Sequence, residues 1–229
     1  MKKINFIDLH GTNAERPEPA NKKIPDWYKK QQSFTNDQKG NPVNNAATIK
    51  KCIPVFDSIT SGYIISTICD LYVERDENNE PRFISSAHNI KYIDGHSKNQ
   101  FAEYNIDYIF LPKIVNSWGI QTPPGYSCLI LPPMHRDNII EILPGVVDTD
   151  KYNVEINFPF KLKDKNFVGL IPSGTPIVQV IPFKRESWES NYIEATGNIR
   201  ALLNSQYFKI RSMFFGVYKK LYWTKKVYK

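Results

Sequence analysis

The stretch "LPGVVDTDKYNVEINFPF", residues 143–160, places Asp148 and Asp150 in a tight segment that a Pro-Gly pair introduces. Carboxylates in such a hairpin either belong to an active site or serve the turn itself. The residues that follow alternate strictly between apolar and polar types, which predicts a strand. We expect one face of this strand to point inward and the other outward. The inward set is Tyr152, Val154, Ile156, Phe158 and Phe160, and the outward set is Asn153, Glu155 and Asn157.

Other side chains of reactive types are scattered. His135 and Arg136 follow two prolines, where the pair either meets a phosphate or carboxylate or lies in a solvated turn. His88 and His96, with Asp94 between them, are of ligand types, but a spacing of eight residues fits no standard metal site. The three cysteines form no CxxC pair, so we expect buried free thiols. The sequence therefore predicts no metal site.

The composition is that of a folded protein rich in sheet-forming residues. Hydrophobic residues make up 41% of the 229 residues and aromatic residues 13%. No run of about 18 apolar residues occurs, so we expect no membrane span. The N-terminus has two lysines and a short apolar patch that Asp8 interrupts, so we expect no secretion through a signal peptide.

The net charge of +7 is concentrated at one end of the chain. No Asp or Glu follows Glu194, whereas eight Lys and Arg residues do. The remainder of the protein is near neutral, so contact with nucleic acid is expected only through this basic tail.

We predict three parts. Residues 1–50 are polar and rich in Pro, Asn and Lys, and indicate an extended arm. Its aromatic pair, Trp27 and Tyr28, either packs on its own domain or docks on another subunit. Residues 51–186 indicate a β domain, and residues 187–229 a basic amphipathic helical tail.

Short strand patterns without helical crossovers predict an antiparallel barrel or sandwich. The candidate strands lie in "CIPVFDSI", "GYIISTICDLYVER", "ERDENNEPRFI", "FAEYNIDYIFLP", "GYSCLILPP", "IIEILPGVVD", "YNVEINFPFKL" and "FVGLIPSGTPIVQVIPFKRE". The third of these is expected to be a hairpin, because Asp and Asn favour its turn.

Apolar residues recur at helical spacing in the tail, which predicts a helix over residues 197–222. We expect Leu202, Leu203, Ile210, Met213 and Phe214 to be buried. The apolar face either packs on the sheet, contacts a partner or another copy, or meets an anionic membrane or nucleic acid. The candidate partner-binding residues of the whole chain are Trp27, Tyr28, Phe214, Phe215, Lys219 and Lys220.

Three segments follow one another in an informative order: "TPPGYSCLILPPMHR", "PGVVDTDKYNVEINF" and "LIPSGTPIVQVIPF". Together they resemble the core motifs of the dUTPase and dCTP deaminase superfamily, over about residues 119–183. The resemblance implies a distorted antiparallel β barrel, the β-clip. The order of arm, barrel and basic helix is also similar to a family of proteins carried by phages.

The resemblance implies roles for particular residues if the chain is an enzyme. Asp148 would activate the attacking water, and Tyr152 would pack under the base and sugar. Gln179 would bind backbone or phosphate, and Arg136 would add positive charge near the phosphates. Mg²⁺ would hold the phosphates under this alternative alone, and otherwise no cofactor is expected.

The chain departs from the enzyme pattern at three places. Asp148 and Tyr152 are four residues apart, where the family has three. "PPMHRDN" stands where the family has a turn with a serine and a glycine that grip phosphate, and the glycine-rich C-terminal arm is missing. We therefore predict a non-catalytic structural or assembly component of a tailed phage, found in the virion or the host cytoplasm. Its expected partners are copies of itself or other subunits. The alternative is a nucleotide-binding or nucleotide-hydrolysing enzyme of the dUTPase or dCTP deaminase type.

Overall fold

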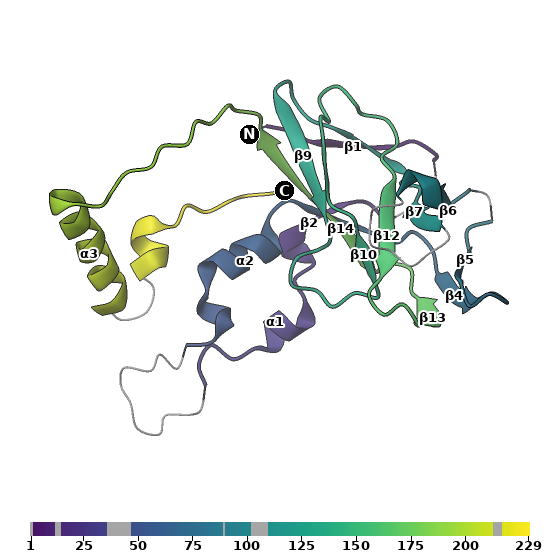
Figure 1. The fold of residues 1–229 in the computed structure, drawn as a ribbon, viewed down its shortest axis with the longest axis horizontal. Coiled ribbons are helices and arrows are strands. Elements are labelled where there is room, and N and C mark those ends of the chain that lie inside the picture. Colours follow the sequence, from purple (N-terminus) through teal and green to yellow (C-terminus); the bar gives the residue numbers. More distant parts are fainter. Residues whose placement is uncertain (1, 12–14, 36–46, 89, 102–109, 213–216) are drawn as a thin grey trace. The chain divides into compact units, whose positions relative to one another are not determined.

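The computed structural model describes residues 2–11, 15–35, 47–88, 90–101, 110–212 and 217–229. The chain forms two compact units (Figure 1). The first unit comprises Met1–Pro25, Ile59–Arg185 and Tyr228–Lys229, and the second comprises Asp26–Ser58 and Glu186–Val227. The three-part division expected from the sequence stays a prediction.

The first unit is built from antiparallel strands. Their bounds are β1 Asn5–Asp8, β2 Glu18–Pro19, β3 Tyr63–Ser66, β4 Leu71–Arg75, β5 Pro81–Ser85, β6 Ile93–Ser97, β7 Phe110–Ile114, β8 Trp118–Gln121, β9 Tyr126–Leu131, β10 Ile140–Ile142, β11 Gly145–Val147, β12 Phe158–Leu162, β13 Gly169–Ile171 and β14 Pro176–Lys184. Two 3₁₀ turns, η1 Ala20–Lys22 and η3 Lys98–Gln100, and the last two residues of a helix, Ile59 and Thr60, also belong to this unit. The predicted mainly β, antiparallel fold with a C-terminal helical segment is confirmed.

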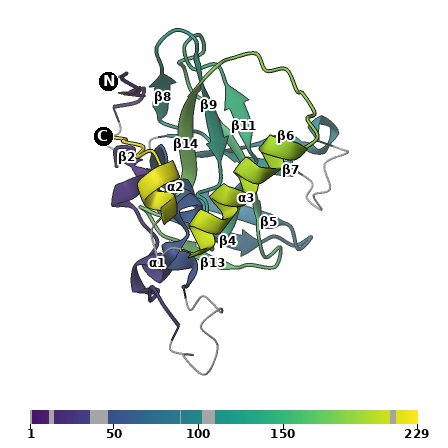
Figure 2. The same ribbon diagram turned by 90° about the vertical axis from the view of Figure 1, so that its left-hand side faces the viewer.

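Within the described residues, the strands pair in four sheets, ordered β11-β9-β14-β3-β2, β10-β12-β7-β6, β13-β4-β5 and β1-β8. Figure 2 shows β9 between β14 and β11. Strands β1 and β2, which belong to the predicted arm, pair with β8 and β3. The hairpin β4–β5, with its turn at Asp76–Glu80, forms where Asp and Asn were expected to favour it.

Strand β14 lies inside the largest sheet and pairs with both β3 and β9. Its central run from Ile177 to Val180 is buried, as an inner strand covered on both faces requires. The core also takes Phe158 and Phe160 from β12, and Phe160 contacts Phe83 edge to face at 5.1 Å between ring centroids. Burial of these large apolar side chains is the main force that stabilises this unit.

The inward face predicted after the aspartate hairpin is correct for three of its five residues and wrong for the other two. Ile156, Phe158 and Phe160 are buried, but Tyr152 and Val154 are 51% and 52% exposed. The amides of Lys151 and Tyr152 both donate to the Asp148 carbonyl, at 2.9 and 2.8 Å. The chain therefore still turns at Tyr152, and strand geometry begins only at Phe158.

The segment "CIPVFDSI" was predicted to be a strand and is instead part of the α-helix α2, Ile53–Thr60. The Phe56 amide donates to the Cys52 carbonyl, and the Ser58 hydroxyl to the Val55 carbonyl. Ile53 and Phe56 stand three residues apart on one helical face, a spacing that a short apolar run does not distinguish from a strand.

The second unit is helical. Its elements are α1 Asp26–Lys30, the 3₁₀ turn η2 Ile49–Lys51, the greater part of α2, α3 Gly197–Ser212 and the π-helical turn η4 Tyr218–Tyr222. The predicted helix over residues 197–222 is present in these two pieces. Its predicted burial is wrong for Leu202, Leu203 and Ile210, which are exposed. Met213 and Phe214 lie outside the described residues. Across the described part of the chain, no helix has the length and apolar character to cross a membrane.

The chain after η4 is anchored to α2 within the second unit. The indole N–H of Trp223 donates to both carboxylate oxygens of Asp57, at 3.0 and 2.8 Å. Lys226 Nζ donates to the same carboxylate at 2.6 Å. In the first unit, the Tyr63 hydroxyl donates to the Lys229 carbonyl at 3.2 Å, and the Tyr63 ring contacts that of Tyr228. We call the Asp57 contact the Trp223 clamp.

Candidate functional site

The aspartate hairpin begins where β11 ends. Strand β11 pairs with β9, which places the turn Asp148–Tyr152 beside the start of β9 at Tyr126. Thr149 is fully buried at the centre of the turn, and its hydroxyl shares a hydrogen bond with that of Thr122 at 2.8 Å. The Thr122 amide also donates to the Thr149 carbonyl, at 3.2 Å. This turn is therefore fixed on the segment that precedes β9.

Arg185, the residue directly after β14, reaches into this turn. Its guanidinium donates from Nη1 to Asp150 Oδ1 at 2.8 Å and from Nη2 to Asp150 Oδ2 at 2.5 Å. Nη1 also lies 3.1 Å from the Tyr126 carbonyl oxygen and 3.0 Å from Ser127 Oγ. The backbone takes part as well, because the Arg185 amide donates to the Gly125 carbonyl at 2.9 Å.

Asp150 is held from two sides. Besides the guanidinium, the Gly125 amide donates to Asp150 Oδ2 at 2.8 Å, and the side chain is 6% exposed. Gly125 has φ +81°, a left-handed conformation that favours glycine and directs its amide at the carboxylate. The hydrogen bonds from Arg185 hold the pKa of Asp150 at about 2, with smaller contributions from the Gly125 amide and the guanidinium charge.

Asp148, the proposed water-activating residue, is part of the same network. The Ser127 hydroxyl donates to Asp148 Oδ1 at 2.6 Å, and Arg185 Nη1 lies 3.2 Å from that oxygen. The hydrogen bond from Ser127, followed by the charge of Arg185, lowers the pKa of Asp148 below its ordinary value. We call Asp148, Asp150, Arg185, Ser127 and the Gly125 amide the Arg185 lock.

A lowered pKa weakens Asp148 as a base. A general base is most effective when its pKa lies near the working pH, and enzymes raise carboxylate pKa values to reach that range. The Arg185 lock does the opposite for both aspartates. Its arrangement stabilises two carboxylates as anions and ties the hairpin to the ends of β9 and β14.

Tyr152 lies at the edge of the turn, with half of its surface exposed. Its hydroxyl donates to the Glu155 carbonyl at 3.2 Å. The residues after it pack on β8, since a Cβ atom on Gly119 would lie 2.6 Å from the Asn153 carbonyl oxygen. The side chain is thus on the surface near Asp148, whereas the alternation of residue types predicted it in the core.

Gln179 lies on β14 and is buried. Its Nε2 donates to the Ser61 carbonyl at 2.7 Å, and its Oε1 accepts from the Met134 amide at 2.9 Å. The side chain therefore joins two backbone segments of the first unit, and both of these contacts are with backbone.

The "PPMHRDN" segment is also engaged with its own unit. The Met134 amide is used by Gln179, and Asn138 Nδ2 donates to the Pro176 carbonyl at 2.7 Å. The Arg136 carbonyl accepts from Lys163 Nζ at 3.4 Å, and Arg136 itself is partly buried. Pro132 and Pro133 have no N–H to offer, so this segment supplies few amides for an anion.

The predicted absence of a metal site stays a prediction, but the side chains can be placed. Among the described residues, no group of three or more His, Cys, Asp or Glu side chains gathers as ligands would. Asp94 pairs with Lys91 at 2.7 Å and Lys113 at 3.1 Å, and these contacts hold its pKa well below the ordinary value. Cys128 is buried, and burial raises the pKa of its thiol, whereas Cys52 is exposed, contrary to the prediction of buried thiols.

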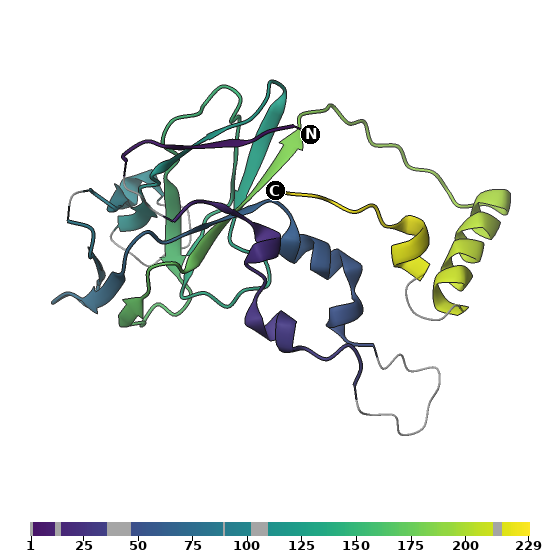
Figure 3. The ribbon, with the colours of Figure 1, turned by 180° about the vertical axis from the view of Figure 1, so that it is seen from behind.

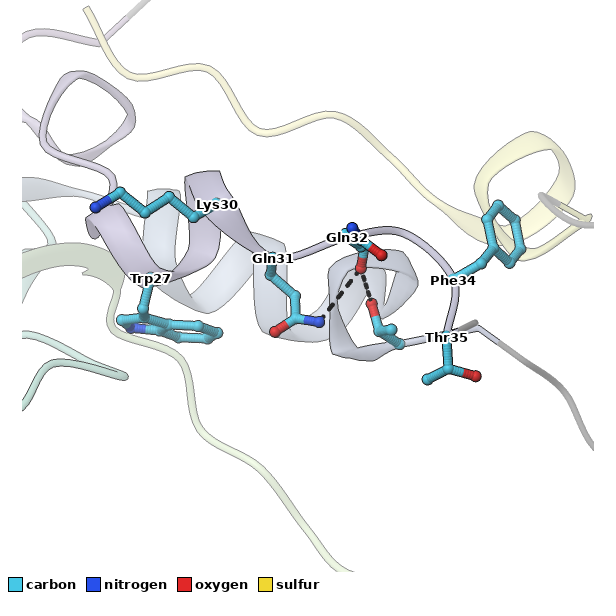
Figure 4. A pocket seen from close by; sticks show the side chains of 7 residues that line it. Trp27, Lys30, Gln31, Gln32, Phe34 and Thr35 are labelled. Atoms are coloured by element: carbon cyan, nitrogen blue, oxygen red, sulfur yellow. Dashed lines mark hydrogen bonds between the residues drawn. The ribbon is translucent and has the colours of Figure 1, made fainter. Parts of the chain in front are cut away.

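The predicted partner-binding residues of the second unit differ in exposure. Tyr28 is buried in its own unit, where its hydroxyl donates to the Lys50 carbonyl at 3.2 Å. Its role in docking stays a prediction. Trp27 is exposed and lines a pocket of about 490 Å³ (Figure 4). The other lining residues are Lys30, Gln31, Gln32, Phe34, Thr35 and Thr48. Lys219 and Lys220 are exposed, and Phe214 and Phe215 lie outside the described residues.

Asp150 and Arg185 were not proposed as site residues from the sequence. Arg185 follows the strand that carries Gln179, but its contact with the hairpin depends on the pairing of β14 with β9. A single sequence does not show which strands pair. The available signal was an Asp-x-Asp turn together with an arginine at a strand end, and this pattern is common in solvated turns.

No protein-family model matches the sequence, and no curated protein matches it. The chain is a mainly antiparallel β protein with a C-terminal helical segment, and among solved structures its fold is similar to that of phage dUTPases, the superfamily that the sequence motifs resemble.

Three of these structures come from two staphylococcal phages. The dUTPase of phage phi11 of S. aureus is 12% identical, with 86% of this chain and 99% of that chain covered and a TM-score of 0.37. The dUTPase of Staphylococcus bacteriophage 80alpha is 13% identical, with 86% and 99% covered and a TM-score of 0.37. A phi11 mutant enzyme with a structural Mg(II) ion is 12% identical, with 84% and 97% covered and a TM-score of 0.38.

Proposed function

We propose that this chain is a non-catalytic protein of dUTPase-like fold that serves as a structural or assembly component of a tailed phage through protein–protein contacts. The observation that carries the proposal is the Arg185 lock. Asp148, the residue that would have to activate water, is bound by Ser127 at 2.6 Å and ion-paired with Arg185 at 3.2 Å. A carboxylate stabilised as an anion in this way is a weak base, and Ser127 and Arg185 hold it in the hairpin.

The "PPMHRDN" segment, which stands where the family has its phosphate-gripping turn, also supports a non-catalytic role. A cradle for phosphate needs several free backbone amides in one turn. Pro132 and Pro133 remove two amides of the "PPMHRDN" segment, and Gln179 uses that of Met134. The basic side chains His135 and Arg136 remain in this segment, but they do not replace the missing turn.

The second unit supports a role in contacts with other proteins. Several large apolar side chains of the segment Glu186–Thr196 and of α3 are exposed. An exposed apolar set of this size on a helix is a frequent mark of an interaction surface. We therefore propose that the second unit makes the contacts with other proteins and that the first unit supports it.

A nucleotide-binding or nucleotide-hydrolysing role is the second candidate, and one observation favours it. Asp148 and Tyr152 are each about half exposed beside one another on the hairpin, so a base and a phosphate would have access to both. Mg²⁺ would be needed under this candidate alone, where it would hold the phosphates of the nucleotide.

The deciding experiment measures pyrophosphate release from dUTP and dCTP in the presence of Mg²⁺. We expect no turnover by the wild-type protein, by Asp148→Asn, or by Asp26→Asn, a surface carboxylate of the second unit that serves as the matched control. A known dUTPase run in parallel validates the assay. Turnover by the wild type and by Asp26→Asn that disappears in Asp148→Asn would establish the enzyme and overturn the proposal.

Binding without turnover has its own measurement. A ligand present at 100 times its dissociation constant stabilises the native state by about 2.7 kcal/mol, which a thermal melt detects. We expect no such shift with dUMP, dUTP or dCTP. A shift that Tyr152→Ala abolishes, in the absence of turnover, would support nucleotide binding.

A further inference from the structure

The segment of the second unit that follows Arg185 is acidic, aromatic and exposed. Residues 186–194, which we call the linker, contain Glu186, Glu189 and Glu194 and form no helix or strand (Figure 3). Trp188, Tyr192 and Ile193 are 87%, 95% and 70% exposed. Exposure of three large apolar side chains to water is unfavourable in proportion to their apolar surface area. The linker is therefore a candidate binding surface for another protein segment.

The helix α3 that follows has the opposite charge and an apolar face of its own. Ile199, Leu202, Leu203, Tyr207 and Ile210 recur at helical spacing, and all are exposed. By the same spacing Arg200 and Lys209 flank this face on its two sides. Since no acidic residue follows Glu194, the charge around α3 is entirely positive in the sequence.

The distribution of charge within the second unit makes linker and helix complementary. The unit holds six Asp and Glu residues, and three of the six lie in the linker. The aromatic side chains of the linker can pack on the apolar face of α3. Its carboxylates can then pair with the basic side chains that flank that face. The same chain carries both surfaces, so a second copy offers each surface its counterpart.

Within one chain the linker does not cover α3. The Ile199 amide donates to the Thr196 carbonyl at 3.1 Å, and Arg200 Nε donates to the Ala195 carbonyl at 3.0 Å, so the chain enters the helix through a fixed turn. Both the linker side chains and the α3 face remain exposed with this turn formed. The chain on either side is also fixed: the Arg185 lock precedes the linker, and the Trp223 clamp follows α3 and η4.

We propose that the linker of one copy docks along the α3 face of a second copy, and that the second linker docks reciprocally on the first helix. The result is a closed dimer with two identical contacts. This inference rests on the proposed function, because it names the partner for an interaction that the proposed function places in the second unit.

The experiment is sedimentation velocity over a concentration series with charge-reversed variants. One variant carries Glu189→Lys and Glu194→Lys in the linker, and the other carries Arg200→Glu and Lys209→Glu on α3. We expect the wild type to dimerise and each variant alone to associate at least tenfold more weakly, because both of its contacts then bring like charges together.

Mixing the two variants is the decisive step. In their heterodimer, a basic linker meets an acidic helix at one contact, and a native linker meets a native helix at the other. We therefore expect the equimolar mixture to dimerise with an affinity near that of the wild type. A chain that carries all four reversals is expected to dimerise as well.

Two further variants separate docking from folding. Trp188→Ser with Tyr192→Ser removes the most exposed apolar groups and is expected to weaken the dimer at least tenfold without altering the melting of the monomer. Phe183→Ser, a change of another exposed aromatic on β14 outside the linker, is the matched control and is expected to leave the dimer intact. Circular dichroism confirms that each variant keeps its helix content.

The outcomes distinguish this inference from the function on which it rests. The inference would be overturned if the wild type is monomeric, or if the charge reversals leave the dimer unchanged. It would also be overturned if the reversals change the melting temperature but not the mass, because α3 then packs on its own chain. A monomer that cosediments with anionic phospholipid vesicles would overturn it as well. All four leave the non-catalytic reading standing, and turnover of dUTP would overturn that reading whatever the state of association.

Discussion

Arg185 holds both carboxylate oxygens of Asp150, Nη1 with Oδ1 at 2.8 Å and Nη2 with Oδ2 at 2.5 Å, across 35 residues of sequence. This two-pronged geometry requires the planar fork of arginine, and lysine does not reproduce it. We expect Arg185→Lys to lower the melting temperature although the charge is kept. Lys184→Arg at the adjacent exposed position is the control and is expected to leave the melting temperature unchanged.

The same contact makes stability sensitive to acid. The pKa of Asp150 in the folded protein is about 2, whereas an unfolded aspartate has a pKa of about 3.9. The folded-state pKa is the lower one, so the stabilisation is fully present above about pH 4 and is lost as the pH falls towards about 2. Asp148, whose pKa is also lowered, acts in the same direction.

Urea denaturation at a series of pH values measures this effect. We expect the free energy of unfolding to fall less steeply with acidification in Asp150→Asn than in the wild type. Some dependence remains in the variant, because Asp94 keeps its two lysine partners and its own low pKa. Parallel curves for the two proteins would show that Asp150 does not contribute.

Gln179 should be among the most sensitive positions of the first unit. Gln179→Leu keeps the volume but leaves the Ser61 carbonyl and the Met134 amide without this partner in a buried place. We expect a loss of about 2–4 kcal/mol in the free energy of unfolding, measured with urea. Gln121→Leu, which removes an exposed hydrogen bond with Asn5, is the control, with an expected change within about 1 kcal/mol. Equal effects of the two substitutions would contradict the prediction.

Gly62 and Gly174 have similar backbone conformations but differ in the space available for an added Cβ atom. Both have left-handed φ, +73° and +80°, but a Cβ on Gly62 would lie 2.0 Å from the Val180 carbonyl oxygen. On Gly174 the nearest atom, Glu15 Oε2, would be 3.5 Å away. We expect Gly174→Ala to cost about 1–2 kcal/mol for its φ alone, and Gly62→Ala to cost more than about 3 kcal/mol or to prevent folding. A smaller loss at Gly62 would mean that β14 shifts to make room.

The Trp223 clamp predicts a change in proteolysis. Asp57→Ala removes the carboxylate that binds Trp223 and Lys226, so the chain after η4 should open more often. We expect trypsin to cleave after Lys225 and Lys226 several-fold faster, as followed by mass spectrometry. Asp26→Ala, a surface carboxylate with Lys29 as a neighbour, is expected to leave these rates unchanged. Equal rates in Asp57→Ala and the wild type would refute the role of the clamp.

The strands were largely predictable because their signals are local. Alternation and turn residues marked β4, β5, β9, β13 and β14, and each lies where its pattern predicted. The helix α2 was taken for a strand because a short apolar run has no distinctive period. Tyr152 is exposed because two hydrogen bonds to the Asp148 carbonyl extend the turn as far as this residue. The alternation of residue types had predicted that the strand begins there.

The candidate site was less predictable than the fold because its partners are distant in sequence. Asp148 stood out by its place in a hairpin, but its effective chemistry is set by Ser127 and Arg185, which strand pairing brings to it. The apolar face of α3 was visible in the sequence, whereas its exposure was not. Periodicity shows that a helix has an apolar side and does not show what covers it.

The place of Arg185 has a mechanical consequence. If a partner pulls on the linker, the tension enters the first unit at Arg185 and runs lengthwise along β14. That strand is hydrogen-bonded to β3 on one side and to β9 on the other. A force along the strand would therefore act on both rows of hydrogen bonds at once, in shear, and would not break a single row one bond at a time. The grip of Arg185 on Asp150 and Gly125 would bear the force first.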